Sequence, residues 1–150
     1  METRLPPPVV MILTGFCMWL LARAWPEAAQ PIPGGRGLAL VLVIAALVLA
    51  GAAAWELYRH RTTINPMMPG QSSALVTSGV FAWSRNPIYV ADALLLFAWT
   101  IHLAYPLAIV GIPLFMGYIH RYQIRPEEQA LEARFGNAFR DYRQRVRRWI

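Results

Sequence analysis

One long apolar run, from Gly37 to Tyr58, constrains the fold of this chain more than any other stretch. It opens with roughly 18 uncharged residues, about the number that an α-helix needs to cross the hydrocarbon core of a bilayer. The small residues from Gly51 to Ala54 would allow another helix to pack closely against it. The basic sequence Arg59-His60-Arg61 follows directly. The sequence therefore predicts a membrane helix over residues 37–58.

Three further apolar segments predict spans over residues 9–23, 87–104 and 107–122. The first is an apolar run of only 14 residues, so a signal peptide cleaved near Arg23 is an alternative to a tilted span. Only Tyr105-Pro106 separates the last two spans, which should form a tight antiparallel hairpin. With 57% hydrophobic and 15% charged residues, the chain is more apolar than a typical soluble domain.

The basic residues divide the chain between two sides of a membrane. All 14 are arginines, and the net charge of +6 is compatible with nucleic acid at first sight. With four spans, however, every arginine except Arg23 and Arg36 falls on the side of the two termini. This asymmetry predicts that both termini are cytoplasmic and that the chain contacts membrane lipid, with no nucleic acid partner. The arginine-rich, lysine-free composition is typical of a GC-rich bacterium, which would place the chain in the inner membrane.

Residues 125–150 should leave the membrane as a helical tail. Pro126 and the two following glutamates suit the first turn of a helix, and Gly136 should interrupt it. Apolar side chains recur at steps of three or four and form one stripe, which contains Leu131, Phe135, Phe139, Tyr142, Val146 and Trp149. Two interpretations stay open: an amphipathic helix lying on anionic lipid, or a lid packed on the preceding loop.

The predicted fold is thus an all-α integral membrane protein with one domain over residues 1–150. It has four transmembrane helices, a tight third–fourth helix hairpin and a C-terminal amphipathic cytoplasmic helical segment. The cytoplasmic loop over residues 62–86 is too long for a simple turn, and loops that connect rigid elements at this length often carry function.

The end of that loop has the features of one wall of a ligand site at the membrane surface. Gly79 would allow the backbone to approach a ligand closely. Pro87 forces Asn86 out of the helical conformation and opens the next helix, with Tyr89 in its first turn. The free N–H groups of such a helix start favour an anion or a carboxylate. An ordinary helix connection is the alternative.

Acidic residues supply further candidates. Asp92 lies inside a predicted span, where a carboxylate is costly and usually functional, although a structural pairing with Arg85 or Arg125 is the alternative. Glu127 and Glu128 are adjacent and should point about 100° apart on a helix, so they cannot share a proton.

One of these two glutamates is expected to face the loop site and the other to face Arg134 or solvent. Cys17 is the only cysteine, and the histidines, His60, His102 and His120, are scattered. No metal site is expected from such spacing.

Two blocks of residues recur in a fixed order in the second half of the chain. The first reads Leu75-Val76-Thr77-Ser78-Gly79-Val80-Phe81 and then Arg85-Asn86-Pro87-Ile88-Tyr89. The second runs from Glu127-Glu128 through Leu131, Phe135-Gly136, Phe139 and Tyr142. Together, over about residues 60–150, they resemble the isoprenylcysteine carboxyl methyltransferases and the phospholipid methyltransferases of the membrane.

The resemblance implies an S-adenosylmethionine site built from the loop, the start of the third span and the segment after the fourth. By position, the residues that would bind the cofactor are Leu75, Val76, Gly79, Phe81, Asn86, Pro87, Ile88, Tyr89 and Glu127. A carboxylate, aromatic rings and free N–H groups suit a sulfonium cation that carries an adenine, a ribose and an amino-acid end. The implied reaction is methyl transfer to a lipophilic or amphiphilic small molecule, with Arg125 and Asp92 as candidates on the substrate side.

Three positions depart from the family pattern. Phe81 stands where tyrosine is frequent, and Asn86 where histidine is frequent. Gln123 stands where the prenylcysteine enzymes have a substrate-binding arginine, and Arg121 or Arg125 would have to replace it. The methyl acceptor therefore stays open between a carboxylate, an amine, a thiol and a phenol.

Other functions also stay open on the sequence. Membrane sterol reductases, which bind a nicotinamide cofactor, are similar in the C-terminal region but have more helices. A small four-helix transporter would use Asp92 as a proton carrier, and would have no need of the long polar loop. A lipid-surface or assembly role would require no chemistry at all.

Overall fold

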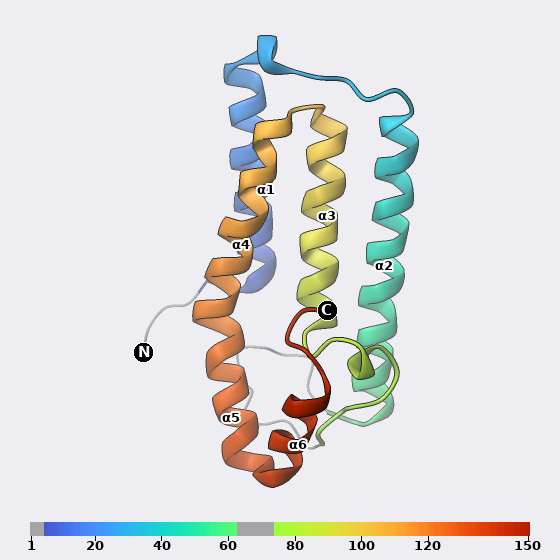
Figure 1. Cartoon of the computed structure of the whole chain (residues 1–150), viewed down its shortest axis with the longest axis vertical. Helices are drawn as coiled ribbons and strands as arrows, with labels where there is room; N and C mark the ends of the chain where they lie inside the picture. The colour runs from blue at the N-terminus through green and yellow to red at the C-terminus, as the bar shows by residue number, and fades with distance from the viewer. Residues whose placement is uncertain (1–4, 63–73) are drawn as a thin grey trace.

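The computed structural model describes residues 5–62 and 74–150 of the chain, and this part is all helical. Four helical rods stand side by side and alternate in direction along the chain (Figure 1). The four main helices are α1 (Pro7–Ala24), α2 (Gly35–Arg59), α3 (Pro87–Leu103) and α4 (Gly111–Ile119). Short 3-10 turns precede three of them: η1 (Pro26–Ala28), η3 (Gly79–Ala82) and η4 (Pro106–Val110). The all-α prediction is confirmed for the described residues.

The fourth rod continues past the end that the sequence predicted. α4 runs without a break through the π-helical turn η5 (His120–Ile124) into α5 (Arg125–Phe135). Pro126 lies in the first turn of α5 with the two glutamates beside it, as predicted, but α5 continues the rod of α4 and does not start apart from it. Proline has no N–H for the ordinary helical bond, and the π turn absorbs the defect because the Arg125 N–H bonds to the His120 carbonyl, five residues back.

Gly136 ends α5, as predicted, with a φ of 52° that a side chain would disfavour. The chain then turns into α6 (Asn137–Arg145). Figure 1 shows that α6 and the C-terminal residues fold back beneath α3. The tail is therefore two short helices and an extended end, and one continuous amphipathic helix is excluded.

The third and fourth rods form the predicted tight hairpin. Ala104 adopts a left-handed conformation that ends α3, and Pro106 opens η4 directly afterwards. Tyr105 between them is buried. The Ala104 carbonyl also accepts a 2.6 Å hydrogen bond from the Gln30 N–H, which ties the α1–α2 connection to this hairpin.

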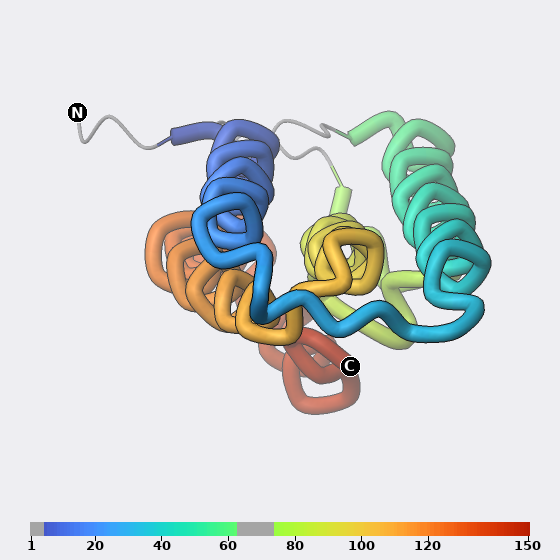
Figure 2. Tube along the Cα trace, turned by 90° about the horizontal axis from the view of Figure 1, so that it is seen from above, coloured from blue at the N-terminus to red at the C-terminus, as the bar shows by residue number. Residues whose placement is uncertain are grey.

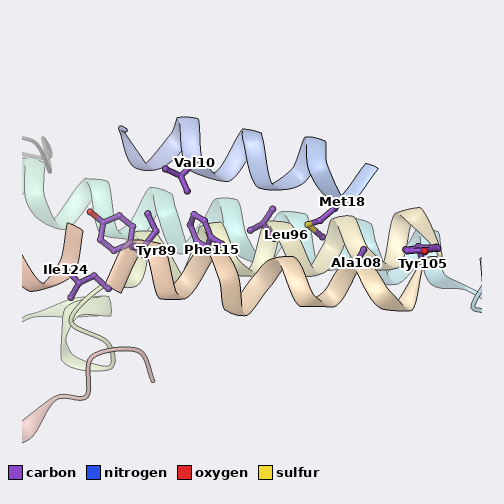
Figure 3. Close-up of a cluster of buried hydrophobic side chains, with 9 residues drawn as sticks. Val10, Met18, Tyr89, Leu96, Tyr105, Ala108, Phe115 and Ile124 are labelled. Carbon is purple, nitrogen blue, oxygen red and sulfur yellow. The ribbon is translucent and has the colours of Figure 1, made fainter. Parts of the chain in front are cut away.

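α3 occupies the middle of the assembly, between α2 on one side and the pair α1 and α4 on the other (Figure 2). Ala39, Ala46 and Ala53 of α2 are buried at intervals of seven residues, so α2 packs along α3 through small side chains. On the other side, Val10 and Met18 point from α1 into a cluster that includes Leu96 and Phe115 (Figure 3). α3 therefore makes most of the contacts between the main helices.

The outer faces of the rods are strongly apolar. α1 and α2 are long and apolar enough to cross a membrane, yet only 17% of each candidate span is buried inside the molecule. A helix in the core of a soluble protein would be mostly covered, whereas Ile12, Val48 and Leu114 each expose about two thirds of their surface. Apolar surface on this scale indicates contact with lipid. The chain therefore has the features of a membrane protein, with two helices that meet the length of a span by themselves.

Candidate functional site

Tyr89 and Glu127 meet at one end of the bundle, as the sequence predicted. Tyr89 lies in the first turn of α3, and its hydroxyl donates a hydrogen bond of 3.2 Å to Oε2 of Glu127 in the first turn of α5. Figure 3 shows Tyr89 beside Ile124, in the π turn that leads to Glu127. Burial raises the pKa of Glu127 to about 7, the neighbouring Glu128 charge adds to this, and the bond from Tyr89 opposes it. The pair is thus a carboxylate that titrates near neutral pH, held by a buried phenol.

Glu128 points away from this contact and joins two arginines. Its Oε1 lies 2.9 Å from the Arg85 guanidinium. Arg148 donates two bonds to the same carboxylate, of 3.0 Å to Oε1 and 2.6 Å to Oε2. The prediction that one glutamate faces the loop site and the other faces Arg134 or solvent is half wrong, because Glu128 is enclosed by this cluster.

Arg85 belongs to the same cluster and is almost fully buried, with 8% of its side chain exposed. Desolvation lowers its pKa, and the Glu128 carboxylate partly restores it. Its Nε atom is buried without a hydrogen-bond partner in the part of the chain that the structure describes. From the sequence, Arg85 was expected only as an alternative partner of Asp92 and Arg148 had no predicted role, since only the contact across the fold makes them partners of Glu128.

The Asn86-Pro87 opening of α3 is as predicted. Asn86 has non-helical backbone angles, and its carbonyl accepts the first helical bond from the Val90 N–H. Its side-chain amide, however, donates a 2.9 Å bond to the Arg148 carbonyl of the C-terminal segment. The C-terminal segment therefore covers the residue that precedes the helix start.

The Ser-Gly turn lies against α2. Ser78 Oγ donates a bond of 2.7 Å to Oε2 of Glu56. A Cβ on Gly79 would stand 2.8 Å from the same carboxylate, so the absence of a side chain allows Glu56 to approach. Gly79 therefore permits the close approach of a carboxylate of the protein itself. A role of Gly79 in cofactor binding stays a prediction. Glu56 itself was not predicted to take part.

The remaining candidates differ in their surroundings. Val76 is buried, and Leu75, Phe81 and Ile88 are half-buried. The Phe81 carbonyl accepts a 2.7 Å bond from the Tyr142 hydroxyl. Each of these residues lies in the segment that leads to Tyr89, and their role as the wall of a ligand site stays a prediction.

Asp92 is half-buried, three residues after Tyr89 on α3. The alternative that Asp92 pairs with Arg85 or Arg125 is wrong. Arg85 pairs with Glu128, and Arg125 is exposed and forms no ion pair with Asp92. Residues 5–62 and 74–150 contain no group of three His, Cys, Asp or Glu side chains that could hold a metal ion.

The two interpretations of the tail are now distinguished. Phe139 and Tyr142, the apolar face of α6, expose only 1% and 3% of their surface because they pack into the body of the protein. The apolar face of α6 is therefore a lid on the loop, where the Tyr142 hydroxyl bonds to the Phe81 carbonyl. The interpretation as a helix on the lipid surface is wrong for this face. Its polar face includes Arg140 and Arg143, which both contact Glu132.

Comparisons with known proteins place these elements in a family. The sequence model of the phospholipid methyltransferase family matches residues 36–138, a region that contains both Tyr89 and Glu127. An uncharacterized protein of Haemophilus influenzae is 43% identical over 63 residues, which are 42% of this chain and 100% of that protein.

The chain is also similar to the mouse enzyme protein-S-isoprenylcysteine O-methyltransferase. The two are 31% identical over 126 residues, which are 81% of this chain but 43% of the mouse enzyme. The chain thus spans less than half the length of that relative. The extent of the family match shows that this chain belongs to the phospholipid methyltransferase family of membrane methyltransferases.

Proposed function

We propose that this chain transfers a methyl group from S-adenosylmethionine to a lipophilic or amphiphilic small molecule at the cytoplasmic side of a membrane. The observation that supports it most is the contact between Tyr89 and Glu127, which joins the two halves of the family pattern 38 positions apart. The family match and the mouse relative, which is named for methylating an isoprenylcysteine, agree with this class of reaction.

The residues present suit the cofactor. Glu127 offers a carboxylate with a pKa near 7 to an amine or to ribose hydroxyls. The first N–H groups of α3, at Ile88 and Tyr89, lack partners within the helix and suit the cofactor's carboxylate. Aromatic rings such as that of Phe81 suit the adenine or the sulfonium cation.

When bound, S-adenosylmethionine supplies the methyl group that is transferred. The protein has little acid–base work in such a reaction, and its contribution is to hold the acceptor in line and to exclude water. The lid made by α6, with Phe139 and Tyr142 buried beneath it, is suited to excluding water from the loop.

We further propose four membrane spans, formed by α1, α2, α3 and the α4 rod, with both termini cytoplasmic and, given the composition, a bacterial inner membrane. α1 supports this as a span because Trp99 of α3 donates a 3.0 Å bond to its Gly15 carbonyl, so α1 is built into the bundle. Single cysteines placed near Arg36 and near Arg145 should react with an impermeant reagent from opposite sides of the membrane.

For the methyl acceptor, we propose only that it is a lipophilic or amphiphilic molecule. Gln123, at the position of the prenylcysteine enzymes' arginine, is buried and donates a 3.0 Å bond to the Leu5 carbonyl. The Gln123 side chain is therefore already bonded to the N-terminal segment. This contact does not support the binding of a prenylcysteine carboxylate at Gln123. Asp92 and Arg125 remain the proposed residues on the substrate side, and methyl transfer from labelled cofactor into host lipid extracts would identify the acceptor class.

The cofactor assignment is tested by equilibrium binding to the purified protein in nanodiscs. S-adenosylmethionine affinity should fall at least tenfold, about 1.4 kcal/mol, in Glu127→Ala and in Tyr89→Phe. Glu132→Ala, which removes a surface carboxylate on the same helix α5, is the matched control. Unchanged affinity in both site variants would remove the basis for the proposal. A parallel titration with a nicotinamide cofactor tests the reductase alternative, which the family match does not favour.

A further inference from the structure

We propose that Glu128 is a positioning residue: it ties the C-terminal strap, residues 146–149, across the start of α3 and so holds Glu127 against Tyr89. The inference rests on the proposed cofactor site and adds to it a part that lies outside the Tyr89–Glu127 contact. It assigns a role to the last residues of the chain, which the sequence pattern treats only as the end of an apolar stripe.

The C-terminal strap is held by its backbone. Beyond α6 the chain becomes extended at Val146, and in Figure 1 it runs back toward the start of α3. The Arg147 carbonyl accepts a 3.0 Å bond from the Arg85 N–H. The Arg148 carbonyl accepts bonds of 2.9 Å from the Asn86 side chain and 3.4 Å from Ser84 Oγ. The strap thus contacts three consecutive residues just before Pro87.

Glu128 closes this arrangement from the side of α5. Both of its oxygens are used: Arg148 binds them as a two-pronged fork, and Arg85 contacts Oε1. The carboxylate exposes 12% of its side chain, and Arg85 8%. Charge-assisted forks of this kind fix orientation as well as distance, so a single carboxylate joins α5, the strap and the residue next to Asn86.

The position of this cluster relative to the site is the reason for assigning it a positioning role. Glu128 follows Glu127 directly, and Arg85 lies one turn of chain before Tyr89. The start of α3 and the start of α5 are therefore joined twice, once by Tyr89 and Glu127 and once by Arg85 and Glu128. Because both oxygens of Glu128 are occupied and its side chain diverges from that of Glu127, it orients the site without contacting the cofactor.

Two charge-removing variants and a matched control test the inference. Glu128→Gln and Arg148→Gln each break the fork, whereas Arg147→Gln changes a neighbouring arginine whose side chain is exposed and whose backbone carbonyl alone is used. All measurements are made in nanodiscs. Amide hydrogen exchange is followed over residues 79–89. The dissociation constant and the KM for S-adenosylmethionine are measured together with kcat.

We expect faster exchange at Arg85, together with a roughly tenfold rise in the dissociation constant and KM and a smaller change in kcat, in both fork variants. Arg147→Gln should match the parent. Arg148→Lys, which keeps the charge but loses the fork, should recover part of the affinity, and this recovery separates positioning from general damage. Should Glu128→Gln fail to fold, the two Arg148 variants decide the question.

Unchanged exchange and unchanged affinity in Arg148→Gln would overturn the inference. Faster exchange with unchanged affinity would also overturn it, because the strap would then be structural only. If the parent protein does not bind S-adenosylmethionine at all, the proposed function fails first and the positioning role fails with it. The binding curve of the parent therefore distinguishes the two failures.

Discussion

The two ends of the helical bundle are held together by different interactions. Toward the Tyr105 hairpin, α1, α3 and α4 meet through apolar and small side chains, with Trp99 and Gly15 sharing an interhelical hydrogen bond. Toward Tyr89, a network of carboxylates, arginines and backbone carbonyls joins the start of α3 to the start of α5 and to the C-terminal strap.

This difference agrees with the proposal that the Tyr89 end is the site and the rest of the bundle is its scaffold. Lipid supplies no hydrophobic force between helices, so close packing of small residues must hold the bundle. At the Tyr89 end, which we propose to face water, polar contacts fix the directions of side chains, as a cofactor site requires. The comparison predicts that substitutions at the two ends act by different mechanisms.

The largest effect is expected for Glu128→Ala. The substitution leaves the buried Arg85 without its carboxylate, and breaking a buried ion pair in this way costs about 3–5 kcal/mol. Thermal unfolding in detergent measures the loss. Glu132→Ala is the control, because Glu132 also contacts two arginines but on the surface, where such pairs contribute about 0–1 kcal/mol. Equal losses for the two glutamates would contradict the account.

Packing at the apolar end should be less costly to disturb. A Cβ at Gly111 would lie 2.8 Å from Cγ and Sδ of Met18, so Gly111→Ala forces α1 and α4 apart and should cost about 1–3 kcal/mol of unfolding free energy. In Gly117→Ala, on the same helix, the new Cβ meets no atom of the described residues within 4 Å. Alanine has the higher helix propensity, so Gly117→Ala should lose no stability. A loss equal to that at Gly111 would show that the contact with Met18 does not decide the result.

The interhelical hydrogen bond between α3 and α1 should contribute less. Trp99→Phe removes the donor to the Gly15 carbonyl, and hydrogen bonds between membrane helices are worth about 0.6–2 kcal/mol. Trp55→Phe, at an exposed position on α2, controls for the loss of an indole. A chemical denaturation series in mixed micelles measures both, and no difference between them would exclude a structural role for this bond.

A pH dependence is also expected at Glu127. Its pKa of about 7 in the fold lies above the ordinary value of 4.5, so between these values the folded protein binds more protons than the unfolded chain. Stability should therefore fall as pH rises from about 4.5 to about 7 and level off above. Glu127→Gln, which imitates the protonated acid, should flatten this slope, and an unchanged slope in thermal melts would assign the titration to another group.

Much of the scaffold could be predicted from the sequence, because lipid exposure is a local property of an apolar run. α2, the opening of α3 at Asn86-Pro87 and the hairpin at Tyr105 followed from composition and from proline and glycine chemistry. The continuation of α4 into α5 did not, since the π turn joins the two helices and Pro126 starts α5 without ending the rod.

The site was predicted only where the family pattern names a residue. Tyr89 and Glu127 were placed together correctly, and their part in binding a cofactor stays a prediction. Asn86 and Arg148, by contrast, are 62 positions apart, and no periodicity or spacing links them. The partner of each charged residue depends on how α6 folds back at Gly136, which a one-dimensional pattern cannot specify.

The central claim, that Tyr89 and Glu127 border the cofactor, is tested most directly by photochemical cross-linking. Labelled S-adenosylmethionine is irradiated with the protein in nanodiscs, and the modified peptides are mapped by mass spectrometry, with excess unlabelled cofactor as competitor. The account predicts that residues 75–89 and 120–128 are labelled and that excess unlabelled cofactor reduces this labelling. The account would be contradicted if the labelling that the competitor reduces were confined to α1 or to the Gly35 half of α2. Labelling that the competitor does not reduce would also contradict it.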